Sequence, residues 1–183
     1  MTEATREFQP PQTITPENLG DDLARLVWES FSDFVSEGEN ETALSGLGLV
    51  DLKGEPDQRA VEEALIFVMW AHTRGAQQAF VGRTPADLLK RTLDAMHSAV
   101  FEDMVENGTP QAQLPFFEQR VGARYAEYHA GAADSDTSLG EAVVQYLTGR
   151  PKSDAPLTLA ITERAVEVAG PLRDYLEDIE LIP

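Results

Sequence analysis

The sequence has no cysteine, little lysine and no long hydrophobic run, and each absence removes a class of protein. Without cysteine there is no disulfide, thiolate nucleophile, cysteine-bound zinc or iron–sulfur cluster. The longest apolar run, Ala64 to Ala71, is far shorter than the ~20 residues that span a bilayer. The first residues lack the basic and apolar regions of a signal peptide. We therefore expect a cytoplasmic protein that does not bind membranes.

Positive charge is also scarce. The 183 residues include 32 Asp and Glu but only 14 Lys and Arg, which gives a net charge of −18 at pH 7. This balance excludes a general nucleic-acid binder, because phosphate binding depends on clustered Lys and Arg. Acid-rich, lysine-poor surfaces are typical of proteins in concentrated salt, where screening reduces self-repulsion. Because the acidic residues are spread along the whole chain, we predict a salt-adapted, halophilic-like acidic surface rather than a docking site for a basic partner.

Helix signals cover most of the chain. Thr15-Pro16-Glu17 combines an N-cap, a proline at the first helical position and an early acid, and apolar residues then recur every three or four positions. No window alternates convincingly with the period of two that marks a strand. The sequence therefore predicts an all-α, single-domain bundle of about six helices. These helices should begin near Pro16, Pro56, Pro85, Pro115, Ser138 and Pro156.

The remaining segments set the organisation of the domain. Residues 1–14 are polar and proline-containing and are predicted to be a loose tail before a helical-bundle domain of residues 15–183. Residues 39–55 are predicted to be a long loop whose apolar side chains tuck under the bundle. The short connections after the second and third helices predict that the second, third and fourth helices are antiparallel neighbours. The apolar stripe of the last helix continues through Pro171, which favours a kink there over an end.

The second predicted helix is apolar on two faces. One face has His72 near its centre, and a second apolar face lies opposite. A helix of this kind is either central to its domain or forms half of a subunit interface. Central packing is one interpretation. Under the other, four residues are candidates for an interface with a second copy or another protein: Phe67, Trp70, Arg74 and Val81.

The histidines do not form a metal motif. Metal sites in helical bundles use Glu-x-x-His on facing helices, and only Asp94-Ala-Met-His97 approximates that pattern. We therefore expect no metal and no cofactor. His72 is predicted to be buried and neutral, bonded to a tyrosine, a backbone carbonyl or a water molecule. His97 lies on the flank of its stripe and is predicted to be more exposed and to titrate more freely.

Counting residues outward from the predicted turns brings several polar side chains to one level of the bundle. Buried polar groups need partners, so such side chains would converge on one another or on a small anion. The candidate ligand-binding residues are His72, His97, Arg124, Tyr125 and Tyr128.

Two functions of different classes follow from these patterns. The first is a non-enzymatic protein-interaction or oligomerisation module, whose partner is a second copy or another protein. The alternative is a binder of a small anion or another small ligand, or an enzyme, that uses the polar layer around His72, His97 and Arg124. No serine lies in a nucleophile-elbow context, and the paired acids are adjacent residues that point to different sides of their helices. The sequence therefore leans against an enzyme.

Overall fold

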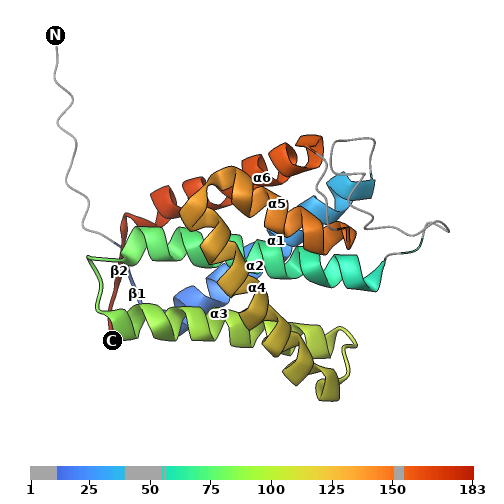
Figure 1. Ribbon diagram of the computed structural model, residues 1–183. Coiled ribbons are helices and arrows are strands. Elements are labelled where there is room, and N and C mark those ends of the chain that lie inside the picture. Colours follow the sequence, from blue (N-terminus) through green and yellow to red (C-terminus); the bar gives the residue numbers. More distant parts are fainter. Residues whose placement is uncertain (1–11, 40–54, 56, 151–154) are drawn as a thin grey trace, which may run out of the picture.

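The computed structural model describes residues 12–39, 55, 57–150 and 155–183. Helices dominate this part of the chain (Figure 1), and a 3-10 turn, Gln111–Gln113, precedes the fourth of them. The predicted all-α bundle is confirmed, and each helix begins within two residues of its predicted start. The last helix continues through Pro171. The helices are α1 (Pro16–Glu39), α2 (Gln58–Phe80), α3 (Ala86–Glu106), α4 (Leu114–Asp134), α5 (Asp136–Thr148) and α6 (Ala155–Leu176).

Local capping explains several of these boundaries. The Asp57 carboxylate accepts a hydrogen bond from the backbone N–H of Ala60 at 3.0 Å, so α2 begins just after Asp57 rather than at the preceding proline. The Ser135 hydroxyl accepts from the N–H of Ser138 at 3.0 Å and starts α5. Gly149 ends α5 in the left-handed conformation, with φ of 66°.

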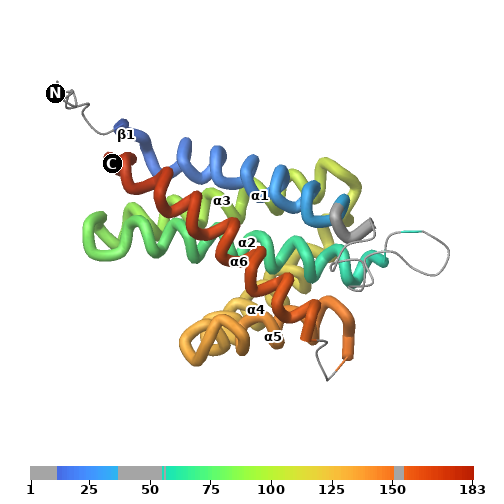
Figure 2. The backbone as a smooth tube through the Cα atoms, turned by 90° about the horizontal axis from the view of Figure 1, so that it is seen from above, coloured from blue at the N-terminus to red at the C-terminus, as the bar shows by residue number. Residues whose placement is uncertain are grey.

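Helix α2 lies in the middle of the bundle (Figures 1 and 2), packed against α6, α1 and α5. Every side chain from Glu63 to Thr73 is buried. Its two apolar faces therefore reflect a central position within the domain. The neighbours of α3 differ from the prediction, because α3 packs mainly along α1 and only slightly against α2, while α4 packs along α5.

Two short strands join the ends of the described chain. Strand β1 (Gln12–Ile14) pairs in parallel with β2 (Ile179–Leu181), and Ile14 lies opposite Leu181. The prediction that residues 12–14 belong to a loose tail is therefore wrong for these three residues. A strand of three residues is too short to show an alternating pattern, and its partner lies more than 160 positions away in the sequence.

Arg83, which follows α2, holds the end of α6 and β2 in place. Its Nε donates to the carbonyl of Ala79 at 2.6 Å, and its Nη1 donates to the carbonyl of Ile179 at 2.9 Å. Its Nη2 donates to the carbonyl of Leu176, the last residue of α6. One guanidinium group thus satisfies carbonyl groups from three elements.

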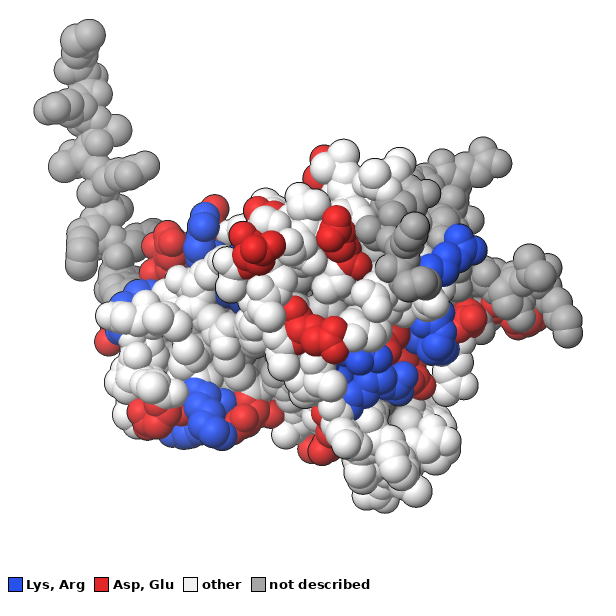
Figure 3. All heavy atoms as spheres, in the orientation of Figure 1, with Lys and Arg blue, Asp and Glu red and all other residues white. Residues whose placement is uncertain are grey.

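The surface agrees with the acidic composition. Figure 3 shows one face of the molecule, on which acidic side chains are spread over several elements. No helix in the described ranges is both long enough and apolar enough to span a bilayer. Residues 1–11 of the predicted tail and residues 40–54 of the predicted long loop lie outside the described residues.

Candidate functional site

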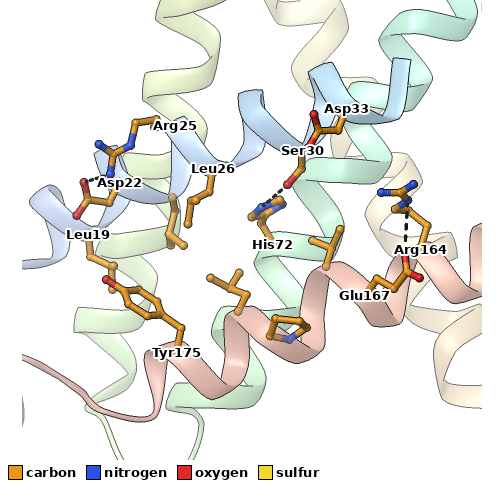
Figure 4. Close-up of a pocket in the computed structure, with 14 residues that line it drawn as sticks. Leu19, Asp22, Arg25, Leu26, Ser30, Asp33, His72, Arg164, Glu167 and Tyr175 are labelled. Carbon is orange, nitrogen blue, oxygen red and sulfur yellow. Dashed lines mark hydrogen bonds and ion pairs between the residues drawn. The ribbon is translucent and has the colours of Figure 1, made fainter. Parts of the chain in front are cut away.

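A groove of about 460 Å³ lies between α1 and α6, with α2 beneath it (Figure 4). It exists because α1 packs along α3, while α6 packs along α2. The volume falls within the ~300–1,000 Å³ typical of small-molecule sites. Most of the wall is apolar, formed by Leu19, Leu23 and Leu26 of α1 and by Val168, Pro171 and Leu172 of α6.

His72 of α2 forms the polar centre of the groove. Its Nδ1 lies 2.8 Å from the carbonyl oxygen of Val68, and a carbonyl only accepts, so Nδ1 carries the proton. In the neutral ring the other nitrogen, Nε2, is then an acceptor, and it lies 3.4 Å from the Ser30 hydroxyl (Figure 4). The side chain is only 3% exposed, and burial lowers the pKa of His72 despite its bond to Val68. The prediction that His72 is buried, neutral and bonded to a backbone carbonyl is confirmed.

Charged side chains flank this apolar groove in two ion pairs (Figure 4). Arg25 and Asp22 form one pair, with 3.0 Å between Nη2 and Oδ1, and Arg164 and Glu167 form the other at 3.9 Å. Tyr175 adds an aromatic ring that is 57% exposed. The groove therefore offers an apolar body, one hydrogen-bond acceptor on its floor and charged edges.

The predicted polar layer does not form as one unit. His97 and Tyr125 do meet, with 2.8 Å between Nε2 and the tyrosine hydroxyl, and the His97 Nδ1 donates to the carbonyl of Leu93. The partner from α2 is Thr73, whose hydroxyl lies 3.4 Å from that of Tyr125. His72 is one position earlier, about 100° around the helix, and faces the α1–α6 groove instead.

His97 only partly matches its prediction. It is more exposed than His72, being half-buried. However, burial lowers the pKa of His97 too, although its bond to Leu93 and the charge of Asp94 act in the opposite direction. The expectation that it titrates freely is therefore not supported. Burial also raises the pKa of Tyr125, so its hydroxyl remains protonated and can donate to His97.

Arg124 and Tyr128 are on the same helix as Tyr125 but contact other residues. Arg124 donates from Nε and Nη2 to the two carboxylate oxygens of Glu63 at 2.9 and 3.0 Å. Its guanidinium also lies over the ring of Tyr146, 3.5 Å from the centroid. Tyr128 is fully buried against Trp70, and its hydroxyl has no hydrogen-bond partner in the described part of the chain.

The four residues predicted for an interface differ in how far they are buried. Phe67 and Trp70 are completely buried inside the chain, so they do not form an exposed face. Arg74 lies over the Trp70 ring at 5.4 Å, where it covers the indole. Arg74 remains partly exposed, and Val81, which is 70% exposed, is the most open of the four. The structure thus favours the central-packing interpretation for Phe67 and Trp70.

Sequence reasoning missed most of the groove, although one signal was present. Ser30, which lines the groove, is a polar residue within the apolar stripe of α1. Glu63, an acid within a helix that is otherwise apolar at its centre, is a similar signal, but it belongs to the contact with Arg124. A polar residue in such a stripe marks a position where a buried partner is required. The α6 wall carried no comparable signal, since its polar residues fit an ordinary exposed helix face.

The described residues contain no group of three or more His, Cys, Asp or Glu side chains that could hold a metal ion.

The comparisons with known proteins add no constraint on the function. No family model matches the chain, and neither does any curated protein or solved structure.

Proposed function

We propose that this protein binds a small, mostly apolar molecule with one hydrogen-bond donor in the groove between α1 and α6. The observation that carries the proposal is the open groove around His72. Nε2 of the neutral histidine lies at the bottom of this apolar groove, and its contact with the Ser30 hydroxyl is long. A ligand hydroxyl or N–H group that reaches Nε2 would make a stronger bond than the one present.

The surroundings of Ser30 favour binding over catalysis. A serine beside a histidine invites comparison with nucleophilic enzymes, in which the second ring nitrogen is oriented by a carboxylate. Here that nitrogen is bonded to the carbonyl of Val68. Ser30 also lies inside α1, where the backbone N–H groups are used within the helix and are not free to stabilise an oxyanion. We therefore propose a binding protein, without a catalytic role for this pair.

Fluorescence titration with two neutral probes tests the proposal. N-phenyl-1-naphthylamine carries an N–H donor, and 1-phenylnaphthalene has a similar shape without it. Leu26→Gln changes the groove wall, and Leu89→Gln is its matched control, because Leu26 and Leu89 are both half-buried leucines and only Leu26 lines the groove. We expect both probes to bind the wild type and the Leu89 variant, and to bind the Leu26 variant much more weakly.

The polar contact has its own test. His72→Leu keeps the apolar walls but removes the acceptor, so we expect it to weaken binding of the naphthylamine about tenfold while changing binding of the hydrocarbon little. Equal binding of both probes to the Leu26 and Leu89 variants would refute the groove as the site. An equal effect of His72→Leu on both probes would refute the role of Nε2.

A second candidate function is self-association, the interaction module expected from the sequence. Two exposed apolar side chains on the outer face of α6 support it. Leu159 and Val166 lie two turns apart and are 58% and 57% exposed. Sedimentation equilibrium of the wild type and of a Leu159→Ser/Val166→Ser variant tests it. A dimer mass for the wild type that becomes monomeric in the variant supports self-association, and a monomeric wild type contradicts it.

A further inference from the structure

Four arginine side chains meet on a part of the surface remote from the α1–α6 groove. Arg59 comes from the first turn of α2, Arg120 and Arg124 from α4, and Arg150 follows the end of α5. They line a pocket of about 440 Å³, and Glu63 is the one acidic residue among its described lining residues. The described part of this acidic chain contains eleven Lys and Arg residues, so four of them share one pocket. Figure 3 shows basic side chains gathered towards the right of the view, where these elements meet.

Three of these arginines are held in position by the fold. Arg124 makes the two-pronged contact with Glu63, whose side chain is only 3% exposed, and rests on the ring of Tyr146. Arg59 donates to the carbonyls of Tyr146 and Leu147 at 2.6 and 3.0 Å, at the end of α5. Their orientations are therefore set before any ligand binds, which reduces the entropy lost on binding.

Arg120 is held by the neighbouring acid and completes the rigid part of the cluster. Its Nη2 donates to Glu62, and its Nη1 lies 3.9 Å from Glu63. Because the two arginines of α4 are one helical turn apart, both guanidinium groups lie along the same edge of the pocket.

The arginine cluster has N–H donors that are not used in these bonds, and it has more positive than negative groups. The Nη1 of Arg124 and the Nε of Arg59 are not used in the bonds described above. Among the described residues, Arg150 forms one hydrogen bond, from its backbone N–H to the Thr148 hydroxyl, and none from its guanidinium. Four positive charges face Glu62 and Glu63, and Glu127, which accepts a bond from Tyr146, adds a third carboxylate nearby. Counted over these described groups, four positive and three negative charges leave the pocket with a charge of +1, whereas the whole chain carries −18.

We propose that this pocket binds a phosphate group. Guanidinium groups present parallel N–H donors that match the oxygens of phosphate, and such charge-assisted bonds are among the strongest that side chains make. The pocket is larger than a single phosphate, so it can accept inorganic phosphate, pyrophosphate or the phosphate of a larger molecule. Arg150, whose guanidinium forms no bond with the described residues, supplies further donors to the anion, while Arg59 and Arg124 form the fixed wall.

Isothermal titration calorimetry tests the proposal with inorganic phosphate, pyrophosphate and adenosine 5′-monophosphate, with chloride balancing the ionic strength. Arg150→Gln removes an exposed side chain that forms no hydrogen bond or ion pair with the described residues, so the variant should fold normally. Arg91→Gln is the control, because Arg91 is an exposed arginine on α3 that pairs with Glu17. We expect saturable binding to the wild type, binding at least about tenfold weaker to the Arg150 variant, and unchanged binding to the Arg91 variant.

The outcomes separate a ligand site from an ion-pair network that serves only stability. Arginine side-chain N–H signals of Arg59 and Arg124 should shift in NMR spectra as the anion is added. Tighter binding of the nucleotide than of inorganic phosphate would support a phosphate carried by a larger molecule, and equal affinities would support recognition of the phosphate alone. No saturable binding of any of the three anions, or equal binding to both variants, would overturn the proposal. Binding of the neutral probes to the α1–α6 groove is independent of this result.

Discussion

Gly20 of α1 lies so near α3 that the effect of adding one methyl group there can be predicted. A Cβ built on Gly20 would lie 2.4 Å from the Cβ of Ala95, and 2.9 Å from both the backbone nitrogen of Met96 and the carbonyl oxygen of Thr92. Carbon atoms in contact are normally ~3.5–4.0 Å apart, so the overlap exceeds an ångström. Because two of the three neighbouring atoms are backbone, no side-chain rotation can relieve it.

Gly122 supplies a matched control within α4. It also lies inside a helix, but a Cβ there would meet nothing within 4 Å. Replacing glycine by alanine in an open helical position stabilises a protein by ~0.5–1 kcal/mol, because alanine loses less conformational freedom on folding. Gly20→Ala gains the same stabilisation, but its methyl group fits only if α1 moves away from α3. Overpacking of this kind destabilises a protein by about 1–3 kcal/mol or more.

We therefore expect opposite signs for the two variants. Taking the upper end of the overpacking range, Gly20→Ala should lower the free energy of unfolding by about 2 kcal/mol, and Gly122→Ala should raise it by up to about 1 kcal/mol. For a chain of this length each kcal/mol shifts Tm by ~2–4 °C, so the two variants should melt about 6–12 °C apart.

Urea unfolding followed by circular dichroism at 222 nm, together with thermal melts, measures both changes under identical conditions. Equal m-values for the variants and the wild type would show that the change lies in stability alone. If Gly20→Ala is as stable as Gly122→Ala, then α1 and α3 are not in close contact at this position, and the reasoning about how the groove arises fails with it.

Three further predictions follow from the surface, the buried histidine and the arginine that ties the chain ends. Raising NaCl from 0.1 to 2 M should increase Tm, because screening weakens the self-repulsion of the −18 chain; an unchanged or lower Tm would remove the salt-adaptation hypothesis. Burial lowers the pKa of His72 from its ordinary 6.5, so between pH 6.5 and that lowered pKa the unfolded chain binds a proton that the folded chain does not. The free energy of unfolding should therefore fall through this pH range more in the wild type than in His72→Leu. At pH 7.5 the free energy of unfolding of His72→Leu should lie within about 1 kcal/mol of that of the wild type, as measured by denaturant titration. Arg83→Gln should cost about 2 kcal/mol and speed hydrogen exchange at the Ile182 amide, which bonds to Ile14 across the small sheet; unchanged exchange would show that the arginine does not hold it.

The helices themselves could be predicted from the sequence because their signals are local. Caps such as Asp57, stops such as Gly149 and apolar repeats of three to four residues act within one or two turns, so neighbouring residues carry the necessary information. The burial of His72 could be predicted for the same reason, since its apolar stripe lies on one helix. The apolar register of α6 also showed correctly that Pro171 does not end the helix.

The partners of each helix were decided only by tertiary packing. The sequence indicates that α2 has two apolar faces, but not that α1 would pack along α3 and leave a groove beside α6. His72 and Thr73 are adjacent in the chain, yet the 100° step between them sends one to the groove and the other towards Tyr125. The four arginines of the phosphate pocket are up to 91 positions apart in the sequence, from Arg59 to Arg150, and the strands at the chain ends are further apart still. Such contacts depend on how whole helices stack, because the free energy of burying their apolar faces is shared over many residues and no local pattern records which face meets which.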